Sequence, residues 1–192
     1  MGRQRIALTI DPLTPEDIPA AIALEQAAYL TPWPQRDYRH ELEQNRLARY
    51  LALRQAAPPG RAEDQAAGLL VGLAGFWLIA GEIHITTIAI QPGWKGRGLG
   101  ERLLVGLLER GETLGGTVAT LEVRPSNRAA LSLYQKYSFQ QVGQRPDYYP
   151  DHETALIMTT PPLASPDYRA LLDRNKAKLA ARLAGQDIEV SS

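Results

Sequence analysis

The chain has 192 residues and no cysteine, and its 21 basic side chains of lysine and arginine balance 21 acidic ones. The missing thiols exclude disulfide bonds, thiolate metal sites and a cysteine nucleophile. Zero formal net charge argues against a protein that binds nucleic acid through bulk charge, because such proteins usually present a basic surface. No stretch is long and apolar enough to span a bilayer, and no secretory signal opens the chain, so we expect a cytoplasmic protein that contacts no membrane.

The first part of the chain predicts strands and short helices. Apolar and β-branched side chains predict strands over residues 6–11, 48–54 and 68–78. Thr14 followed by Pro15 and acidic residues is typical of a helix start, and we expect a second helix over residues 35–45. Residues 56–67 are polar and contain prolines, so they are expected to form a long hairpin connection.

The middle of the chain predicts a strand, a glycine loop, a helix and a second strand. Residues 83–90 are rich in β-branched side chains and predict a buried strand, and residues 118–123 predict its partner. Between them, leucines recur at helical spacing over residues 101–108. A crossover of this length makes the strands parallel neighbours, and ligands of parallel sheets bind beyond the carboxyl ends of the strands.

The loop that opens this helix has the spacing basic-x-x-Gly-x-Gly, from Lys95 to Gly100. A dinucleotide fingerprint would need glycine at the position of Glu101, and the Gly-Lys-Ser/Thr ending of a Walker loop is absent. Free backbone N–H groups and the positive end of the helix dipole meet at such a loop. The loop is therefore expected to bind a phosphate-bearing ligand, although many glycine loops are only tight turns.

The rest of the chain predicts a helix over residues 127–137 and closing strands over residues 139–144 and 154–159. We expect one domain over residues 1–160 and a basic amphipathic helical extension over residues 161–192. The apolar stripe of the extension consists of Tyr168, Leu172, Leu179 and Leu183. The extension either docks on its own domain or serves dimerisation or the binding of acidic or RNA-bearing partners, so a monomer and a homodimer both remain open.

Read together with its flanks, the loop resembles the GNAT family of N-acetyltransferases, and more narrowly the RimI-type enzymes that acetylate the N-terminal alanine of a ribosomal protein. The resemblance rests on Ile88-Ala89-Ile90, Pro92, Lys95-x-x-Gly98-x-Gly100, the run 121–127, Ala130-Leu131-x-Leu133-Tyr134, Phe139 and Asp147-Tyr148-Tyr149-Pro150. It follows the element order of residues 6–160 and is densest over 83–159. Lys95 stands where the family usually has arginine or glutamine, a mild departure because the backbone binds most of the phosphate. The implied fold is the α/β (α+β) GNAT fold, a mixed sheet with flanking helices whose central parallel strands splay apart.

The resemblance implies acetyl-coenzyme A (acetyl-CoA) as cofactor, held by the loop amides and by the open edge of the splayed strand. The residues it assigns to the cofactor are Ile88, Ala89, Ile90, Lys95, Gly96, Arg97, Gly98, Leu99, Gly100 and Asn127. Asn127 also stands where a helix N-cap belongs, and the two roles are compatible. The backbone N–H of Ile90 is the expected donor to the carbonyl oxygen that gains negative charge. The histidines are scattered, so no metal site is expected.

The resemblance also assigns the proton transfers. Glu122, at the carboxyl end of its strand, would act as general base through a water molecule, and Tyr134 would act as general acid toward the departing thiolate. From the residues alone, Glu122 also fits a solvated strand-end carboxylate, and Tyr134 also fits a core side chain. Because no acyl-cysteine can form, we expect the acetyl group to pass directly to the acceptor in a ternary complex.

An N-terminal amine is the acceptor that best suits a carboxylate base. Its pKa is about 8, against about 10.4 for lysine, so far more of it is uncharged and reactive at neutral pH. By resemblance, Thr31, Trp33, Tyr148 and Tyr149 line the acceptor groove, although Trp33 also fits a packing role under its loop. The expected partner is the N-terminus of a ribosomal protein, without direct contact to nucleic acid. Lysine side chains, small-molecule amines and a non-catalytic CoA-binding role remain alternatives.

Overall fold

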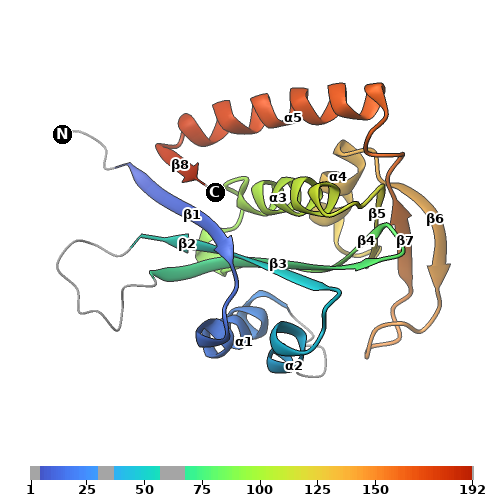
Figure 1. Ribbon diagram of the computed structural model, residues 1–192, viewed down its shortest axis with the longest axis horizontal. Helices are drawn as coiled ribbons and strands as arrows, with labels where there is room; N and C mark the ends of the chain where they lie inside the picture. The colour runs from blue at the N-terminus through green and yellow to red at the C-terminus, as the bar shows by residue number, and fades with distance from the viewer. Residues whose placement is uncertain (1–4, 30–36, 57–67, 192) are drawn as a thin grey trace.

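A mixed β-sheet runs through the whole molecule, with helices on both of its faces (Figure 1). The structure is a computed structural model, and it describes residues 5–29, 37–56 and 68–191. Its strands are β1 (Ile6–Pro12), β2 (Ala48–Gln55), β3 (Leu69–Ile79), β4 (Glu82–Ile90), β5 (Val118–Val123), β6 (Gln140–Arg145), β7 (Ala155–Thr159) and β8 (Ile188–Ser191). Its α-helices are α1 (Ile18–Ala28), α2 (Tyr38–Glu43), α3 (Leu99–Thr113), α4 (Arg128–Lys136) and α5 (Pro166–Ala184). The strand order is β6-β7-β5-β4-β3-β2-β1-β8.

The pairing of the strands confirms the predicted mixed α/β architecture. Strands β1 to β4 are antiparallel neighbours, β4 and β5 are parallel across the α3 crossover, and β5, β7 and β6 are antiparallel. The helix expected over residues 35–45 is shorter in the described part of the chain. Asp37 caps its start by accepting the N–H of His40, and Asn45 accepts the N–H of Leu47 and turns the chain toward β2.

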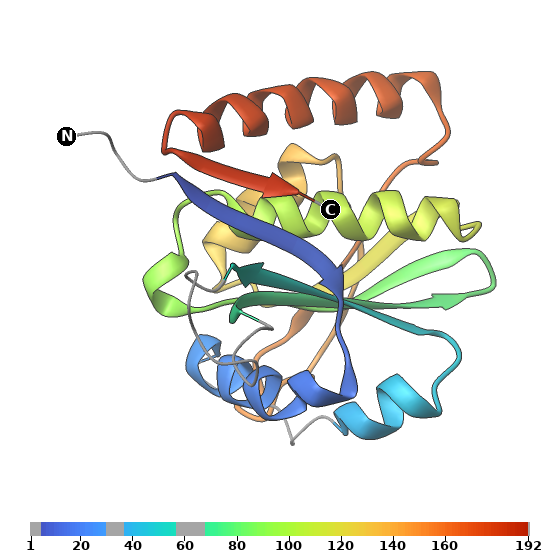
Figure 2. The same cartoon turned by 60° about the vertical axis from the view of Figure 1, so that its left-hand side comes forward.

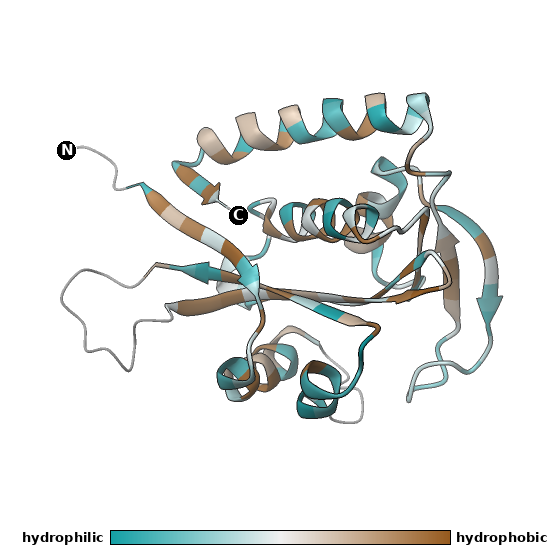
Figure 3. Ribbon diagram, in the orientation of Figure 1, coloured by the Kyte–Doolittle hydropathy of each residue, from teal (hydrophilic) through white to brown (hydrophobic). Residues whose placement is uncertain are grey.

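The core lies on both faces of the central strands. The strands β3 and β4 are mainly hydrophobic, whereas the edge strand β6 is mainly hydrophilic (Figure 3). Helices α1 and α2 cover one face, and α3 and α5 lie over the other (Figure 1). The predicted leucine stripe of α3 is confirmed, because Leu103, Leu104, Leu107 and Leu108 are at most 1% exposed. This packing fixes the start of α3, and with it the glycine loop, against the sheet.

The segment beyond residue 160 lies on the same sheet. Helix α5 runs antiparallel to α3 and above it (Figures 1 and 2), and Tyr168, Leu179 and Leu183 of its predicted stripe are buried. Strand β8 follows and pairs in parallel with β1, with Ile188 opposite Ile6. The extension predicted to be helical over residues 161–192 is therefore helical only over Pro166–Ala184, and strand β8 corrects that prediction at its end. Nowhere in the described part of the chain does a helix have the length and apolar character needed to span a bilayer.

Asp17 anchors the start of α1 to β2. Its carboxylate accepts N–H groups from Arg54 at 2.7 and 2.6 Å, and from the Thr14 backbone at 2.8 Å. Burial raises the pKa of Asp17, but the hydrogen bonds from Arg54 and Thr14 outweigh it, and the pKa lies below its ordinary value. The charged carboxylate therefore stabilises the fold at neutral pH, and this contribution is lost as the pH falls through the lowered pKa.

We expect Asp17→Asn to lower the free energy of unfolding by about 3 kcal/mol at neutral pH, because it leaves the Arg54 guanidinium without its buried counterion. Urea denaturation at about pH 7 and about pH 3 measures this, and the difference from the wild type should shrink at the lower pH. Asp11→Asn is the control, since Asp11 also faces Arg54, at 3.6 Å, but is 50% exposed. Its loss should stay below about 1 kcal/mol, and equal losses for both variants would contradict the role given to Asp17.

Candidate active site

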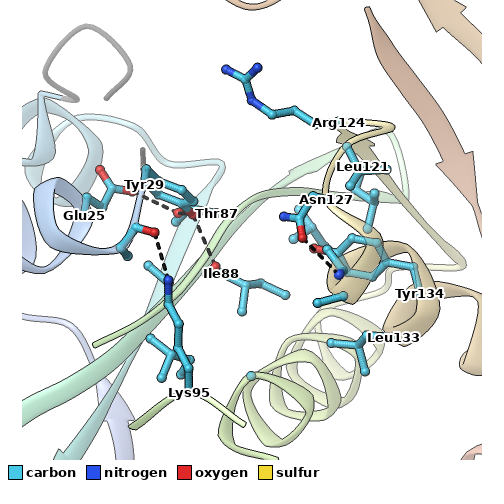
Figure 4. A pocket seen from close by; sticks show the side chains of 18 of the residues that line it. Glu25, Tyr29, Thr87, Ile88, Lys95, Leu121, Arg124, Asn127, Leu133 and Tyr134 are labelled. Atoms are coloured by element: carbon cyan, nitrogen blue, oxygen red, sulfur yellow. Dashed lines mark hydrogen bonds between the residues drawn. The ribbon is translucent and has the colours of Figure 1, made fainter. Parts of the chain in front are cut away.

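A cavity of about 1150 Å³ opens between β4 and β5 at their carboxyl ends. Its walls come from β4, the glycine loop, β5, α4 and the end of α1, which lie far apart in the sequence. Figure 4 shows side chains from these elements around the cavity. The position is the one expected for a ligand of a parallel strand pair.

The cavity exists because β4 and β5 diverge. They pair only as far as Ile85 and Leu121. Beyond this point β5 stays paired with β7 as far as Val123, and β4 stays paired with β3 as far as Ile90. The register of β4 against β3 shifts at the same point, since Ile85 and Thr87 face consecutive residues of β3 and leave Thr86 as an extra residue. A β-bulge bends and twists its strand, so the bulge at Thr86 turns β4 away from β5.

Backbone groups of β4 face the cavity along the edge that leaves β5. The N–H of Gln91 donates to the Val71 carbonyl of β3 at 2.9 Å. Because successive residues of a strand direct their N–H groups to opposite sides, the N–H groups of Ile90 and Ile88 point into the gap between β4 and β5, which is called the splay below. Together with Ala89, these residues line the cavity. The strand segment that is expected to hold the cofactor therefore borders the cavity.

The glycine loop closes one end of the cavity at the start of α3. Gly96 and Gly98 have φ angles of +80° and +92°, in the left-handed region that other residues rarely adopt. The N–H of Arg102 donates to the carbonyl of Gly98, and the amides before it have no acceptor within the helix. A Cβ added at Gly96 would meet nothing within 4 Å, so open space lies beside these amides. Such a cradle fits a phosphate group.

Most of the loop residues assigned to the cofactor border the cavity. Its lining includes Lys95, Gly96, Gly98, Leu99 and Gly100. Arg97 is not among the lining residues, and its guanidinium lies over the ring of Trp94, 4.8 Å from the centroid. The Lys95 ammonium donates to the Ala28 carbonyl at 3.1 Å (Figure 4), which ties the loop to the end of α1.

Glu122 on β5 and Tyr134 on α4, the expected base and acid, both line the cavity. The Glu122 carboxylate lies 3.3 Å from the Arg145 guanidinium, and its side chain is 26% exposed. The ring of Tyr134 packs on Phe139, with 5.6 Å between ring centroids. Burial, with a smaller effect from nearby tyrosines, raises the pKa of Tyr134 well above its ordinary value. Its hydroxyl therefore stays protonated at neutral pH.

Of the other side chains singled out from the sequence, some line the cavity and others do not. Asn127 lines the cavity, and its Oδ1 accepts a first-turn N–H of α4 at 3.2 Å, so the predicted cap is confirmed. Tyr149 lines the cavity, and burial raises its pKa to about 12. Tyr148 is not among the lining residues and packs edge to face on Tyr149, with 5.2 Å between centroids. Thr31 and Trp33 lie outside the described residues.

A hydrogen-bonded chain from α1 reaches the same cavity without any sign of it in the sequence. The Thr87 hydroxyl donates to the Glu25 carboxylate at 2.9 Å. The Tyr29 hydroxyl lies 2.8 Å from the Thr87 hydroxyl and 3.2 Å from the Ile88 carbonyl, the two acceptors within reach of its single proton. Figure 4 shows this chain across the cavity from Tyr134. It places a carboxylate and a phenol on the α1 side of the splay.

Arg124 fastens the loop before β7 to the end of β5. Its guanidinium lies 3.7 Å from the centre of the Tyr149 ring and 2.8 Å from the carboxylates of Asp151 and Glu153. The hydrogen bonds from Arg124 lower the pKa of both carboxyl groups. Arg124 lies within the conspicuous run 121–127, but the sequence assigns it no role. In the structure it holds Tyr149 at the cavity wall.

Known proteins share this architecture. The model of the acetyltransferase (GNAT) family matches residues 18–139. The ribosomal protein bS18-alanine N-acetyltransferase of Salmonella typhimurium is 35% identical over 156 residues, which cover 80% of this chain and 97% of that protein. The N-alpha-acetyltransferase RimI of Mycobacterium tuberculosis is 35% identical over 149 residues, 74% of this chain and 84% of that protein.

A solved structure agrees with the sequence relatives. The crystal structure of the ribosomal-protein-S18-alanine N-acetyltransferase from Escherichia coli matches with a TM-score of 0.66 and 31% identity, over 80% of this chain and 93% of that chain. The NatC complex bound to Gag peptide and CoA matches with a TM-score of 0.68 at 18% identity, a likeness of fold alone. The family model and the identity over most of both chains show that this chain belongs to the acetyltransferase (GNAT) family.

Proposed function

We propose that the chain is an N-terminal protein acetyltransferase that uses acetyl-CoA and acts on the N-terminal alanine of a ribosomal protein. The observation that carries the proposal is a single cavity that joins an amide cradle, the edge of β4, a carboxylate on β5 and a protonated tyrosine on α4. The acceptor is supported by the relatives named as alanine N-acetyltransferases of ribosomal protein S18.

The residues around the cavity fit acetyl-CoA. The loop amides between Gly96 and Gly100 suit its diphosphate, and the backbone of Ile88 and Ile90 suits the amide groups of its pantetheine arm. Leu121 adds apolar wall to the same cavity. When bound, acetyl-CoA supplies an acetyl group activated as a thioester.

Each chemical requirement of the transfer has a residue at the cavity. Glu122, directly or through a water molecule, takes the proton from the acceptor amine, so that the amine attacks uncharged. The Ile90 N–H, which points into the splay, stabilises negative charge on the carbonyl oxygen. Tyr134 holds its proton because its pKa is raised, and gives it to the departing sulfur. The chain has no thiol of its own to carry the acetyl group, which favours direct transfer in a ternary complex.

Release of CoA in the presence of acetyl-CoA and a synthetic peptide that begins with alanine tests the proposal. We expect turnover with the free N-terminus and none with the same peptide after its α-amine is blocked. A blocked peptide that contains lysine, and a polyamine, are the matched alternatives. Faster turnover on either would reassign the acceptor, and CoA binding without turnover on any amine would favour a binding module.

A further inference from the structure

The end of α5 and the turn that follows it contact the back of the glycine loop at successive residues. The Arg182 guanidinium donates to the Gly96 carbonyl at 2.6 Å, and the Gln186 side-chain amide donates to the Arg97 carbonyl at 3.3 Å. The Leu179 side chain packs beside Gly98, where an added Cβ would come within 3.1 Å of it. Because α5 runs antiparallel to α3, its last turns reach the start of α3 (Figure 2). The helix lies beyond residues 18–139, which the family model matches.

These contacts fix the direction of the loop amides. The loop peptide bonds are trans, and a planar trans peptide directs its C=O and its N–H to opposite sides. The Gly96 carbonyl is held toward α5, so the N–H of Arg97 points away from α5. The Arg97 carbonyl is held in the same way, so the N–H of Gly98 also points away. In a loop with glycines at left-handed φ, these bonds restrict rotations that glycine would otherwise allow.

Arg182 also brings a positive charge to the phosphate cradle. It lines the cavity together with Lys95, Gly96 and Gly98, and a guanidinium carries further N–H donors beyond the one that binds Gly96. Preorganised donors and a nearby cation both favour an anionic ligand, and a charge-assisted hydrogen bond is about twice as strong as a neutral one.

We propose that α5 is a built-in part of the phosphate site, in which Arg182 positions the glycine loop and adds positive charge at the diphosphate of the acyl donor. This inference rests on the proposed function, since it takes CoA as the ligand. It makes Arg182 a positioning and binding residue for the donor, with no part in the proton transfers.

The test uses Arg182→Met in the full chain, with titration calorimetry of CoA and of dephospho-CoA, which keeps the diphosphate but lacks the ribose phosphate. We expect binding of both to weaken about tenfold, and kcat at saturating acetyl-CoA to stay unchanged. Acetyl transfer from S-acetylpantetheine, which has no diphosphate, should be the same as for the wild type.

Arg182→Lys keeps the charge, so its affinity for CoA should lie between that of the wild type and that of Arg182→Met. Arg174→Met is the control, because Arg174 is exposed on the same helix and outside the cavity lining.

Unchanged CoA affinity in Arg182→Met would overturn the inference while leaving the proposed function intact. An equal loss with S-acetylpantetheine would also overturn it, because the change would then act on the whole fold. A loss seen with CoA but absent with dephospho-CoA would overturn the assignment to the diphosphate. A wild-type chain that produces no heat with CoA would overturn the proposed function itself, and this inference with it.

Discussion

Replacing Glu122 with glutamine is expected to lower kcat for acetyl transfer by about 100-fold or more, the usual scale for loss of a general base. The amide keeps the size of the side chain but cannot take a proton from the acceptor amine. The fold should survive, because the ion pair between Glu122 and Arg145 is partly exposed and such pairs contribute at most about 1 kcal/mol. Steady-state CoA release with the alanine peptide measures the effect, and titration with CoA should show unchanged affinity.

The conservative change Glu122→Asp separates chemistry from packing. It keeps a carboxylate but shortens its reach, so it should retain more activity than the glutamine variant. Glu109→Gln is the control for the loss of an acidic side chain, since Glu109 lies on α3, pairs with Lys176 and is outside the cavity lining. Undiminished kcat in Glu122→Gln would show that another group, or water, accepts the proton.

Replacing Tyr134 with phenylalanine is the second change with a large expected effect, a loss in kcat of about 100-fold. The ring and its packing on Phe139 are kept, and the proton donor for the departing sulfur is removed. Because burial raises the pKa of Tyr134, the wild-type hydroxyl stays protonated below its raised pKa. The wild-type rate should therefore show no fall from ionisation of this tyrosine up to about pH 10, the ordinary tyrosine value. A kcat profile from neutral to basic pH, recorded for the wild type and for Tyr134→Phe, measures the loss in kcat and the pH dependence.

Tyr137→Phe is the matched control, at the residue that follows the last turn of the same helix. Its hydroxyl is buried and donates to Glu101 at 2.8 Å; Glu101 lines the cavity, but Tyr137 itself is not among the lining residues. Loss of the hydroxyl should cost about 1.5–3 kcal/mol of stability through the missing hydrogen bond to a charged group and leave kcat unchanged. If Tyr134→Phe kept full activity, protonation by solvent would replace the role given to Tyr134.

The parts of the fold that the sequence predicts are those with a local signal. The leucine spacing of α3, the β-branched runs of β4 and β5 and the cap at Asn127 each follow from neighbouring residues, and the structure has them all. The glycines between Lys95 and Gly100 belong to the same class, because a left-handed backbone is a property of single residues. The crossover rule then places loop and strand ends at one edge of the sheet.

The features that the sequence does not reveal depend on contacts between distant segments. The bulge at Thr86 arises from the alignment of β4 against β3. The place of Tyr29 depends on a hydroxyl partner, Thr87, that lies 58 residues away. Of the adjacent Tyr148 and Tyr149, the sequence cannot say which faces the cavity. The structure answers through Arg124, which lies over the ring of Tyr149.

The pairing of β8 with β1 has a consequence for aggregation. A long, exposed edge strand is a template on which another molecule can add a strand. Strand β8 covers β1 from Ile6 to Thr9, and the rest of β1 includes Asp11, which carries a charge, and Pro12, which has no N–H to donate. At this end of the sheet β8 becomes the edge strand, and its four residues, Ile188–Ser191, offer a shorter template for intermolecular strand addition than β1 would.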